Sequence, residues 1–242
     1  MKTANRVVGF LLLSTLCFCS NSGKAEAERQ ADTVKLPVQS SLSEYQKDVA
    51  RDSSYLLVPL LSRTPGLQAD LRYATVQNFV GRKMYPAGTN ETYLRKPAAD
   101  ALRRVQAELG RKGLGLKIFD AYRPYEVTCH FWELIRDERY VANPAKGSGH
   151  NRGLAIDLTI IKLDNGQELD MGTGFDHFSD SAHHSFTAFT EEILQNRKLL
   201  KSLMEKQGFK SLETEWWHYS WPDDKKYPVM NLSFRQLSKS RQ

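Results

Sequence analysis

Two short segments, far apart in the sequence, supply side chains that together could bind a metal ion. The segments Ser148-Gly-His-Asn-Arg-Gly-Leu-Ala-Ile-Asp157 and Glu215-Trp-Trp-His218 contain two imidazoles and two carboxylates. Zinc in a hydrolase commonly takes three ligands from His, Asp or Glu and leaves a fourth position for water, with a separate carboxylate nearby to move protons. The pattern therefore predicts a catalytic zinc site with three ligands and one base: His150, Asp157 and His218, and Glu215.

The charges of these four groups support this division of roles. Two neutral imidazoles and one carboxylate leave zinc with a net positive charge, which lowers the pKa of bound water toward about 7. A second carboxylate ligand would weaken that effect, so Glu215 is better placed as a proton acceptor beside the metal. The alternatives are a structural loop histidine at His150 and an ordinary amphipathic core strand around His218.

The spacing of the two segments constrains the elements that carry them. Asp157 lies in an apolar run typical of a buried strand, where an unpaired carboxylate is costly. His150 is seven residues earlier and would face the other side of one continuous strand. Gly153 can adopt backbone angles that other residues avoid, so we expect His150 in a turn that leads into the strand of Asp157. A second strand must begin or bend between Glu215 and His218 for both to face one metal.

Hydrophobic periodicity and terminal signals predict the surrounding elements. Helices are expected at 96–111, 124–136 and 190–207, and strands at 116–120, 153–161 and 216–221. Helices and strands alternate irregularly, which favours an α+β fold over a doubly wound sheet. No repeat or long linker divides the chain, so we expect a single domain from residue 55 to 242, preceded by a polar, loosely packed extension at 28–54.

The first residues are typical of a secretory signal peptide. Lys2 and Arg6 stand just before an apolar run at 7–19, and small and polar residues follow this run up to Ala27. The run is shorter than the roughly 20 apolar residues of a membrane span, so no stable span is expected. We therefore predict a signal peptide at 1–27 and an exported, periplasmic protein. Lipid anchoring through a cysteine is the alternative, disfavoured by the bulky residues before Cys17 and Cys19.

The charge of the chain does not indicate a nucleic-acid partner. The net charge is +6 and the pI about 9.1. Lys and Arg are nevertheless scattered among acidic residues, without a basic block or interleaved aromatic residues. We expect a small-molecule substrate and no nucleic acid, and the sequence leaves the oligomeric state open.

With these residues in place, the sequence resembles the D-alanyl-D-alanine dipeptidases of the vancomycin-resistance type, in the zinc DD-peptidase family. The patterns S-x-H-x-x-G-x-A-x-D and E-W-W-H are matched in full. The similarity covers about 58–227 and includes Tyr73-Ala-Thr with Asn78-Phe79, Asp120-Ala-Tyr-Arg-Pro124 and Met171-Gly-Thr-Gly-Phe-Asp176. The resemblance implies a central antiparallel sheet flanked by helices (the zinc DD-peptidase or Hedgehog-like fold) and hydrolysis of free D-Ala-D-Ala.

The resemblance also implies roles for single residues. One Zn²⁺ per chain would be held by the three predicted ligands, with Glu215 as general base and acid. Arg123 matches an arginine that stabilises the oxyanion, although an ion pair with Asp120 is its ordinary alternative. The residues matched to substrate binding are Asp176 and Tyr73 for the free ammonium and Ser148 for the terminal carboxylate. A pocket anchored at both ends fits a free dipeptide.

The predicted signal peptide distinguishes this chain from the resistance enzymes, which work in the cytoplasm. An exported dipeptidase cannot deplete the cytosolic D-Ala-D-Ala pool, so we expect a role in cell-wall turnover or scavenging. One alternative is a zinc D,D- or L,D-carboxypeptidase that trims peptidoglycan peptides and shares the metal site. Another is a non-catalytic, zinc-stabilised binding domain, against which Glu215 and Arg123 argue. Four histidines match no motif: His130, His177, His183 and His184.

Overall fold

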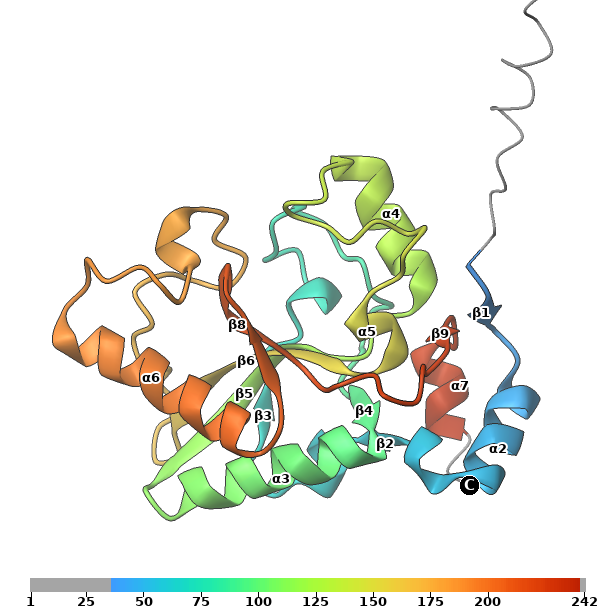
Figure 1. The fold of residues 1–242 in the computed structure, drawn as a ribbon, viewed down its shortest axis with the longest axis horizontal. Coiled ribbons are helices and arrows are strands. Elements are labelled where there is room, and N and C mark those ends of the chain that lie inside the picture. The colour runs from blue at the N-terminus through green and yellow to red at the C-terminus, as the bar shows by residue number, and fades with distance from the viewer. Residues whose placement is uncertain (1–35, 240–242) are drawn as a thin grey trace, which may run out of the picture. The chain divides into compact units, whose positions relative to one another are not determined.

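The computed structural model of the chain describes residues 36–239, so the predicted signal peptide lies outside the described residues. Helices and strands mix in the α+β arrangement that the sequence predicts (Figure 1). The α-helices are α2 (Leu42–Arg51), α3 (Lys96–Gly110), α4 (Tyr125–Ile135), α5 (Gly149–Arg152), α6 (Glu191–Lys206) and α7 (Phe234–Lys239). Short 3₁₀ helices are η1 (Ser53–Tyr55), η2 (Leu61–Arg63), η3 (Arg72–Ala74) and η4 (Asp180–Ala182).

A central five-stranded sheet organises the fold, in the order β3-β5-β6-β8-β7. Its strands are β3 (Gln68–Ala69), β5 (Leu114–Asp120), β6 (Ala155–Lys162), β7 (Lys210–Leu212) and β8 (Glu215–Ser220). Neighbours in this sheet are antiparallel, except that β3 runs parallel to β5 at one edge. Smaller pairs are formed by β2 (Leu57–Pro59) with β4 (Tyr93–Arg95) and by β1 (Val38–Gln39) with β9 (Val229–Met230). The predicted central antiparallel sheet is confirmed.

The three central strands bring one polar residue each to the same level of the sheet. Asp157 on β6 is paired with Asp120 on β5 and with His218 on β8. Alternate residues of β6, such as Ile156 and Leu158, are fully buried in the main core with α3 and α6. Because successive strand residues face opposite sides, Asp157 points away from that core. Figure 1 shows α3 on one side of the sheet strands and α4 on the other.

The predicted helices form because their apolar residues recur at helical spacing. In α3, Pro97 lies in the first turn, and Leu102, Val105 and Leu109 are fully buried against the sheet. Helix α6 begins after Thr190, whose hydroxyl accepts a hydrogen bond from a backbone N–H of the first turn. Among residues 36–239, no helix is both long and apolar enough to cross a bilayer.

Residues 36–54 differ from the loosely packed extension that the sequence predicts. This segment forms β1, α2 and η1, and Tyr45 of α2 is only 3% exposed. The Tyr45 hydroxyl accepts a hydrogen bond from the Leu57 amide at 2.9 Å, and its ring packs near Met230. Most α2 residues are polar, and few of its side chains are apolar. The helix is therefore stabilised more by the residues that pack against it than by its own composition. The folded part therefore includes this segment.

Candidate active site

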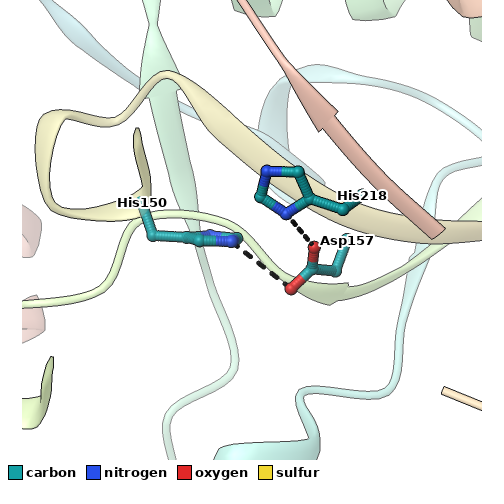
Figure 2. A group of neighbouring side chains, drawn as sticks. All are labelled: His150, Asp157 and His218. Carbon is teal, nitrogen blue, oxygen red and sulfur yellow. Dashed lines mark hydrogen bonds and ion pairs between the residues drawn. The ribbon is translucent and has the colours of Figure 1, made fainter. Parts of the chain in front are cut away.

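The structure brings the three predicted metal ligands together from three different elements. His150 lies on α5, Asp157 on β6 and His218 on β8, and one ligand atom from each lies within 4.8 Å of the others (Figure 2). Asp157 lies between the two rings, with Oδ1 at 2.9 Å from His218 Nδ1 and Oδ2 at 3.4 Å from His150 Nε2. The three side chains thus converge on one point with two nitrogen donors and one carboxylate.

A single turn of helix places His150. Ser148 caps α5, with its hydroxyl accepting from the Asn151 amide at 3.2 Å, and the Asn151 side chain accepts from the Ser148 amide at 3.0 Å. Gly153 ends the helix at φ +70°, and a Cβ there would lie 2.5 Å from a Leu57 methyl group. The turn expected before β6 is therefore a short capped helix, and a larger residue than glycine would not fit at its end.

Hydrogen bonds outside the triad orient both imidazole rings. His150 Nδ1 lies 2.7 Å from the Ala121 carbonyl oxygen, to which it donates, so its Nε2 lone pair faces Asp157. His218 Nε2 lies 3.1 Å from Ser220 Oγ, which leaves Nδ1 to face the same carboxylate. Burial lowers the pKa of both rings, so both are neutral and each can offer a lone pair to a metal ion near pH 7.

The carboxylate of Asp157 also fits a bound cation. The residue is 3% exposed, and burial, with the charge of Asp120 as a smaller cause, raises the pKa of Asp157 well above its usual value. A buried acid of this kind is stable as an anion only beside a positive charge. Two imidazole nitrogens and a carboxylate form a donor set that suits a divalent transition metal ion.

Glu215 reaches the site because β8 begins there. Its Oε2 lies 4.0 Å from His218 Nδ1, and its side chain keeps 24% of its surface exposed. The pairing of β7 with β8 shifts register between Ser211 and Leu212, and this irregularity lets Glu215 and His218 face the same side although they are three positions apart. Burial raises the pKa of Glu215, and the proximity of His218 opposes that shift.

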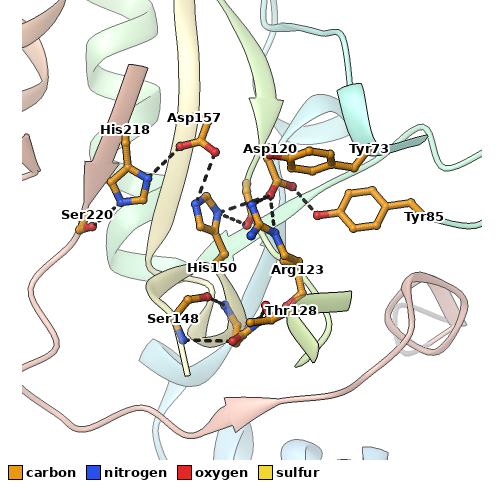
Figure 3. Close-up of polar contacts among 12 residues, drawn as sticks. Tyr73, Tyr85, Asp120, Arg123, Thr128, Ser148, His150, Asp157, His218 and Ser220 are labelled. Atoms are coloured by element: carbon orange, nitrogen blue, oxygen red, sulfur yellow. Dashed lines mark hydrogen bonds and ion pairs between the residues drawn. The ribbon is translucent and has the colours of Figure 1, made fainter. Parts of the chain in front are cut away.

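Arg123 lies on the other side of the triad and forms the ion pair that was its ordinary alternative. Its Nε and Nη2 donate to Asp120 Oδ2 at 3.0 and 2.7 Å, and Tyr85 donates to the second oxygen of Asp120 (Figure 3). The guanidinium carbon also lies 5.0 Å from the ring centres of Tyr73 and Phe131. These contacts hold the guanidinium next to the candidate metal site. Arg123 is therefore both a partner of Asp120 and a residue of the site.

Asp176 and Tyr73 form a second polar pair in the site. The Tyr73 hydroxyl donates to Asp176 Oδ2 at 3.0 Å, and burial raises the pKa of Asp176 well above its usual value. Asp176 has φ +58°, a strained conformation for a residue other than glycine. Strain of this kind is concentrated at functional sites, where the surrounding structure holds it in place.

All eight predicted site residues line one cavity of about 260 Å³. They are Tyr73, Arg123, Ser148, His150, Asp157, Asp176, Glu215 and His218. Sequence reasoning missed Tyr85, which holds Asp120, and Ser220, which orients His218. No sequence signal marked Tyr85. His177 lines an adjoining cavity and not this one.

Comparisons with known proteins show the family to which the chain belongs. Residues 53–237 match the peptidase family described as D-ala-D-ala dipeptidase. The D-alanyl-D-alanine dipeptidase of Escherichia coli is 36% identical, covering 74% of this chain and 91% of the relative. That of Enterococcus faecalis is 34% identical, covering 70% and 92%. The solved LdcB LD-carboxypeptidase is 22% identical, covering 66% and 82%, with a TM-score of 0.36, too low to bear on function. This chain belongs to the D-Ala-D-Ala dipeptidase family, and it is a hydrolase.

Proposed function

We propose that this chain is a zinc-dependent dipeptidase that hydrolyses D-alanyl-D-alanine. The observation that carries the proposal is the convergence of a His-Asp-His donor set, Glu215 and Arg123 on one small cavity. At about 260 Å³, this cavity lies below the roughly 300–1,000 Å³ of pockets for drug-sized ligands, which favours a small substrate. The names of the two relatives, each covered over more than nine-tenths of its length, support the same substrate.

The chain would hold zinc through His150 Nε2, His218 Nδ1 and the carboxylate of Asp157. Zinc, when bound, supplies a Lewis acid that polarises a carbonyl and makes water reactive near neutral pH. The hydrogen bond that His150 Nδ1 donates to the Ala121 carbonyl leaves His150 Nε2 free for this binding, and Ser220 Oγ can accept from His218 Nε2, which would leave His218 Nδ1 free.

Glu215 moves the proton in the proposed reaction. It accepts a proton from the attacking water and delivers it to the nitrogen of the leaving D-alanine. Burial raises the pKa of Glu215, which helps the carboxyl group hold a proton between these two steps. The charge of a bound cation would oppose this shift. Its Oε2 lies 4.0 Å from Nδ1 of His218, one of the proposed ligands.

The remaining residues position the two charged ends of the dipeptide. The carboxylate of Asp176, held by Tyr73, would accept the free ammonium, and the hydroxyl of Ser148 would donate to the terminal carboxylate. Ser148 uses an oxygen lone pair to cap α5, so its hydroxyl hydrogen remains available to the substrate. Arg123 would stabilise the negative oxygen that forms at the attacked carbonyl.

The substitution Arg123→Lys should lower kcat by roughly 10²–10³-fold, the usual cost of losing a donor that stabilises an oxyanion. Lysine keeps the charge but cannot donate to Asp120 and to the substrate in the fixed geometry of a guanidinium. Steady-state kinetics with D-Ala-D-Ala test this, with a melting curve to verify folding. An unchanged kcat would leave Arg123 as a structural partner of Asp120 only.

The substitution Asp176→Asn should raise KM for D-Ala-D-Ala by roughly 10- to 100-fold, because a hydrogen bond to a charged group contributes about 1.5–3 kcal/mol. Asparagine can still accept from the Tyr73 hydroxyl, so the local structure is preserved while the charge is lost. Initial rates over a range of dipeptide concentrations measure this effect. A KM equal to that of the wild type would mean that Asp176 does not bind the ammonium.

The location and pathway of the protein are also part of this proposal. The pattern of residues 1–27 supports export to the periplasm, and the proposed substrate supports a role in the turnover or scavenging of cell-wall peptides. Fractionation of the natural host, followed by detection of the chain, tests the location.

The proposal is tested by hydrolysis of free D-Ala-D-Ala by the zinc-loaded protein, beside N-acetyl-D-Ala-D-Ala, with and without a chelator. We expect cleavage of the free dipeptide only, and its loss with the chelator. Efficient cleavage of the acetylated peptide would instead indicate the carboxypeptidase alternative. Zinc binding without cleavage of either peptide would contradict the proposed function.

A further inference from the structure

A second cavity, of about 520 Å³, adjoins the active-site cavity. Seven residues line both cavities, and three of these shared residues are Tyr140, Phe178 and Leu212. Each of the three is a large apolar residue with 37–40% of its surface exposed. Single exposed apolar residues are ordinary, but three that come from separate segments and meet at the mouth of a polar site indicate a role there.

A ring contact joins two of these shared side chains. Tyr140, in the loop between α4 and α5, and Phe178, in the loop between β6 and α6, have ring centres 4.7 Å apart. Helix α4 and the loop that follows it lie on the side of the sheet opposite α3 (Figure 1). The Arg139 guanidinium, itself bound to Asp137, lies 5.2 Å from the Tyr140 ring centre and helps to order that ring. We call the pair Tyr140 and Phe178 the barrier.

The barrier lies near the residues proposed to bind the ammonium end of the substrate. Phe79 connects the two regions, because its ring centre is 5.2 Å from that of Phe178 and 6.2 Å from that of Tyr73. Tyr73 donates to Asp176, and Phe178 follows Asp176 by two residues. One aromatic ring therefore separates the barrier from the Tyr73–Asp176 pair, which places it on the amino side of a bound dipeptide.

We propose that the barrier sets the length of peptide that the site accepts, by blocking extension beyond the amino end of a dipeptide into the second cavity. This inference rests on the proposed dipeptidase function. Asp176 selects for a free ammonium by its charge, whereas the barrier excludes longer peptides because its side chains fill the space that they need. Asp180 lines the second cavity alone, and Glu138 lines both cavities, so the ammonium of a longer peptide can lie beside an acidic group once the barrier is removed.

The test uses Tyr140→Ala, Phe178→Ala and the double variant, each with D-Ala-D-Ala and with tri-D-alanine. The tripeptide adds one residue and keeps a free ammonium, so it tests length separately from charge. We expect the ratio of kcat/KM for tripeptide over dipeptide to rise by about tenfold or more in the double variant, since contacts of this size discriminate by about 10- to 200-fold. Consumption of the intact tripeptide is followed by chromatography.

Phe186→Ala is the matched control. Phe186 forms a similar ring contact with Phe189, at 4.9 Å, and lines neither cavity. This variant should keep the wild-type ratio. A double variant that melts like the wild type and keeps the wild-type ratio would overturn the barrier, and so would an equal rise of the ratio in Phe186→Ala.

A binding measurement separates failure of the barrier from failure of the proposed function. In a Glu215→Gln background, calorimetry compares the Kd values of D-Ala-D-Ala and tri-D-alanine without turnover. We expect the double variant to shift this preference toward the tripeptide. If the wild type does not cleave the dipeptide, the proposed dipeptidase function is refuted. If the double variant has the same binding preference as the protein with an intact barrier, the barrier is refuted, whatever the wild type cleaves.

Discussion

Replacing Glu215 with glutamine is expected to lower kcat for D-Ala-D-Ala by roughly 10²–10⁴-fold, the usual contribution of a general base and acid, while the metal content stays unchanged. Glutamine has nearly the same shape as glutamate and can hydrogen-bond, but it cannot accept and return a proton. Glu215 lies 4.0 Å from His218 Nδ1, while Asp157 lies 2.9 Å from the same atom, so the metal keeps its three proposed ligands in this variant. Steady-state kinetics and metal analysis of the same sample measure both quantities.

Glu213→Gln is the control for this prediction. Glu213 is two residues earlier, is largely exposed near Lys201 and lines neither of the two cavities. The same chemical change there should leave kcat and metal content at wild-type values. Loss of metal from Glu215→Gln would indicate that Glu215 is a ligand, and a wild-type kcat would show that it is not the base.

The elements with strong periodicity could be predicted from the sequence, and the weakly patterned ones could not. Helix α3 and strand β6 have regular apolar stripes that bury completely, so their own residues determine them. Helix α2 has few apolar residues, and Tyr45 is buried in a cluster with residues distant in the sequence, such as Tyr93 and Met230. The edge strand β3 has two residues, whose pairing with β5 is set by tertiary contacts.

The site shows the same division between local and tertiary information. The sequence places His150 before a glycine and Asp157 on a strand, and the structure has both, with Gly153 at positive φ. The pairing of Asp157 with His218 depends on the antiparallel register of β6 and β8, which neither segment specifies alone.

The partners of the site residues were harder to foresee. Asp120 faces the site because the pairing of β5 and β6 shifts between Ile118 and Asp120, an irregularity without a sequence signature here. Tyr140 and Phe178 lie in two loops without periodicity, and only the folded structure places their rings 4.7 Å apart.

The substitution His218→Ala is expected to remove both the metal and the activity. The proposed site has three protein ligands, and the two that remain cannot complete a stable zinc site. We expect substoichiometric zinc after dialysis and no measurable hydrolysis of D-Ala-D-Ala. His130→Ala is the control, because His130 is exposed on α4 and should lose neither zinc nor activity. A His218→Ala variant that keeps zinc and turnover would contradict the assignment of this ligand.

Melting curves with and without a chelator give a second measure of the same ligand that does not depend on turnover. A metal that binds only the folded state stabilises it by RT ln(1 + [L]/Kd), about 2.7 kcal/mol when the free metal is about 100-fold above Kd. Chelation should therefore lower the Tm of the wild type and of His130→Ala. It should leave the Tm of His218→Ala unchanged, because that variant has no bound metal to lose. An equal fall of Tm in His218→Ala would mean that the metal that stabilises the fold is held without His218.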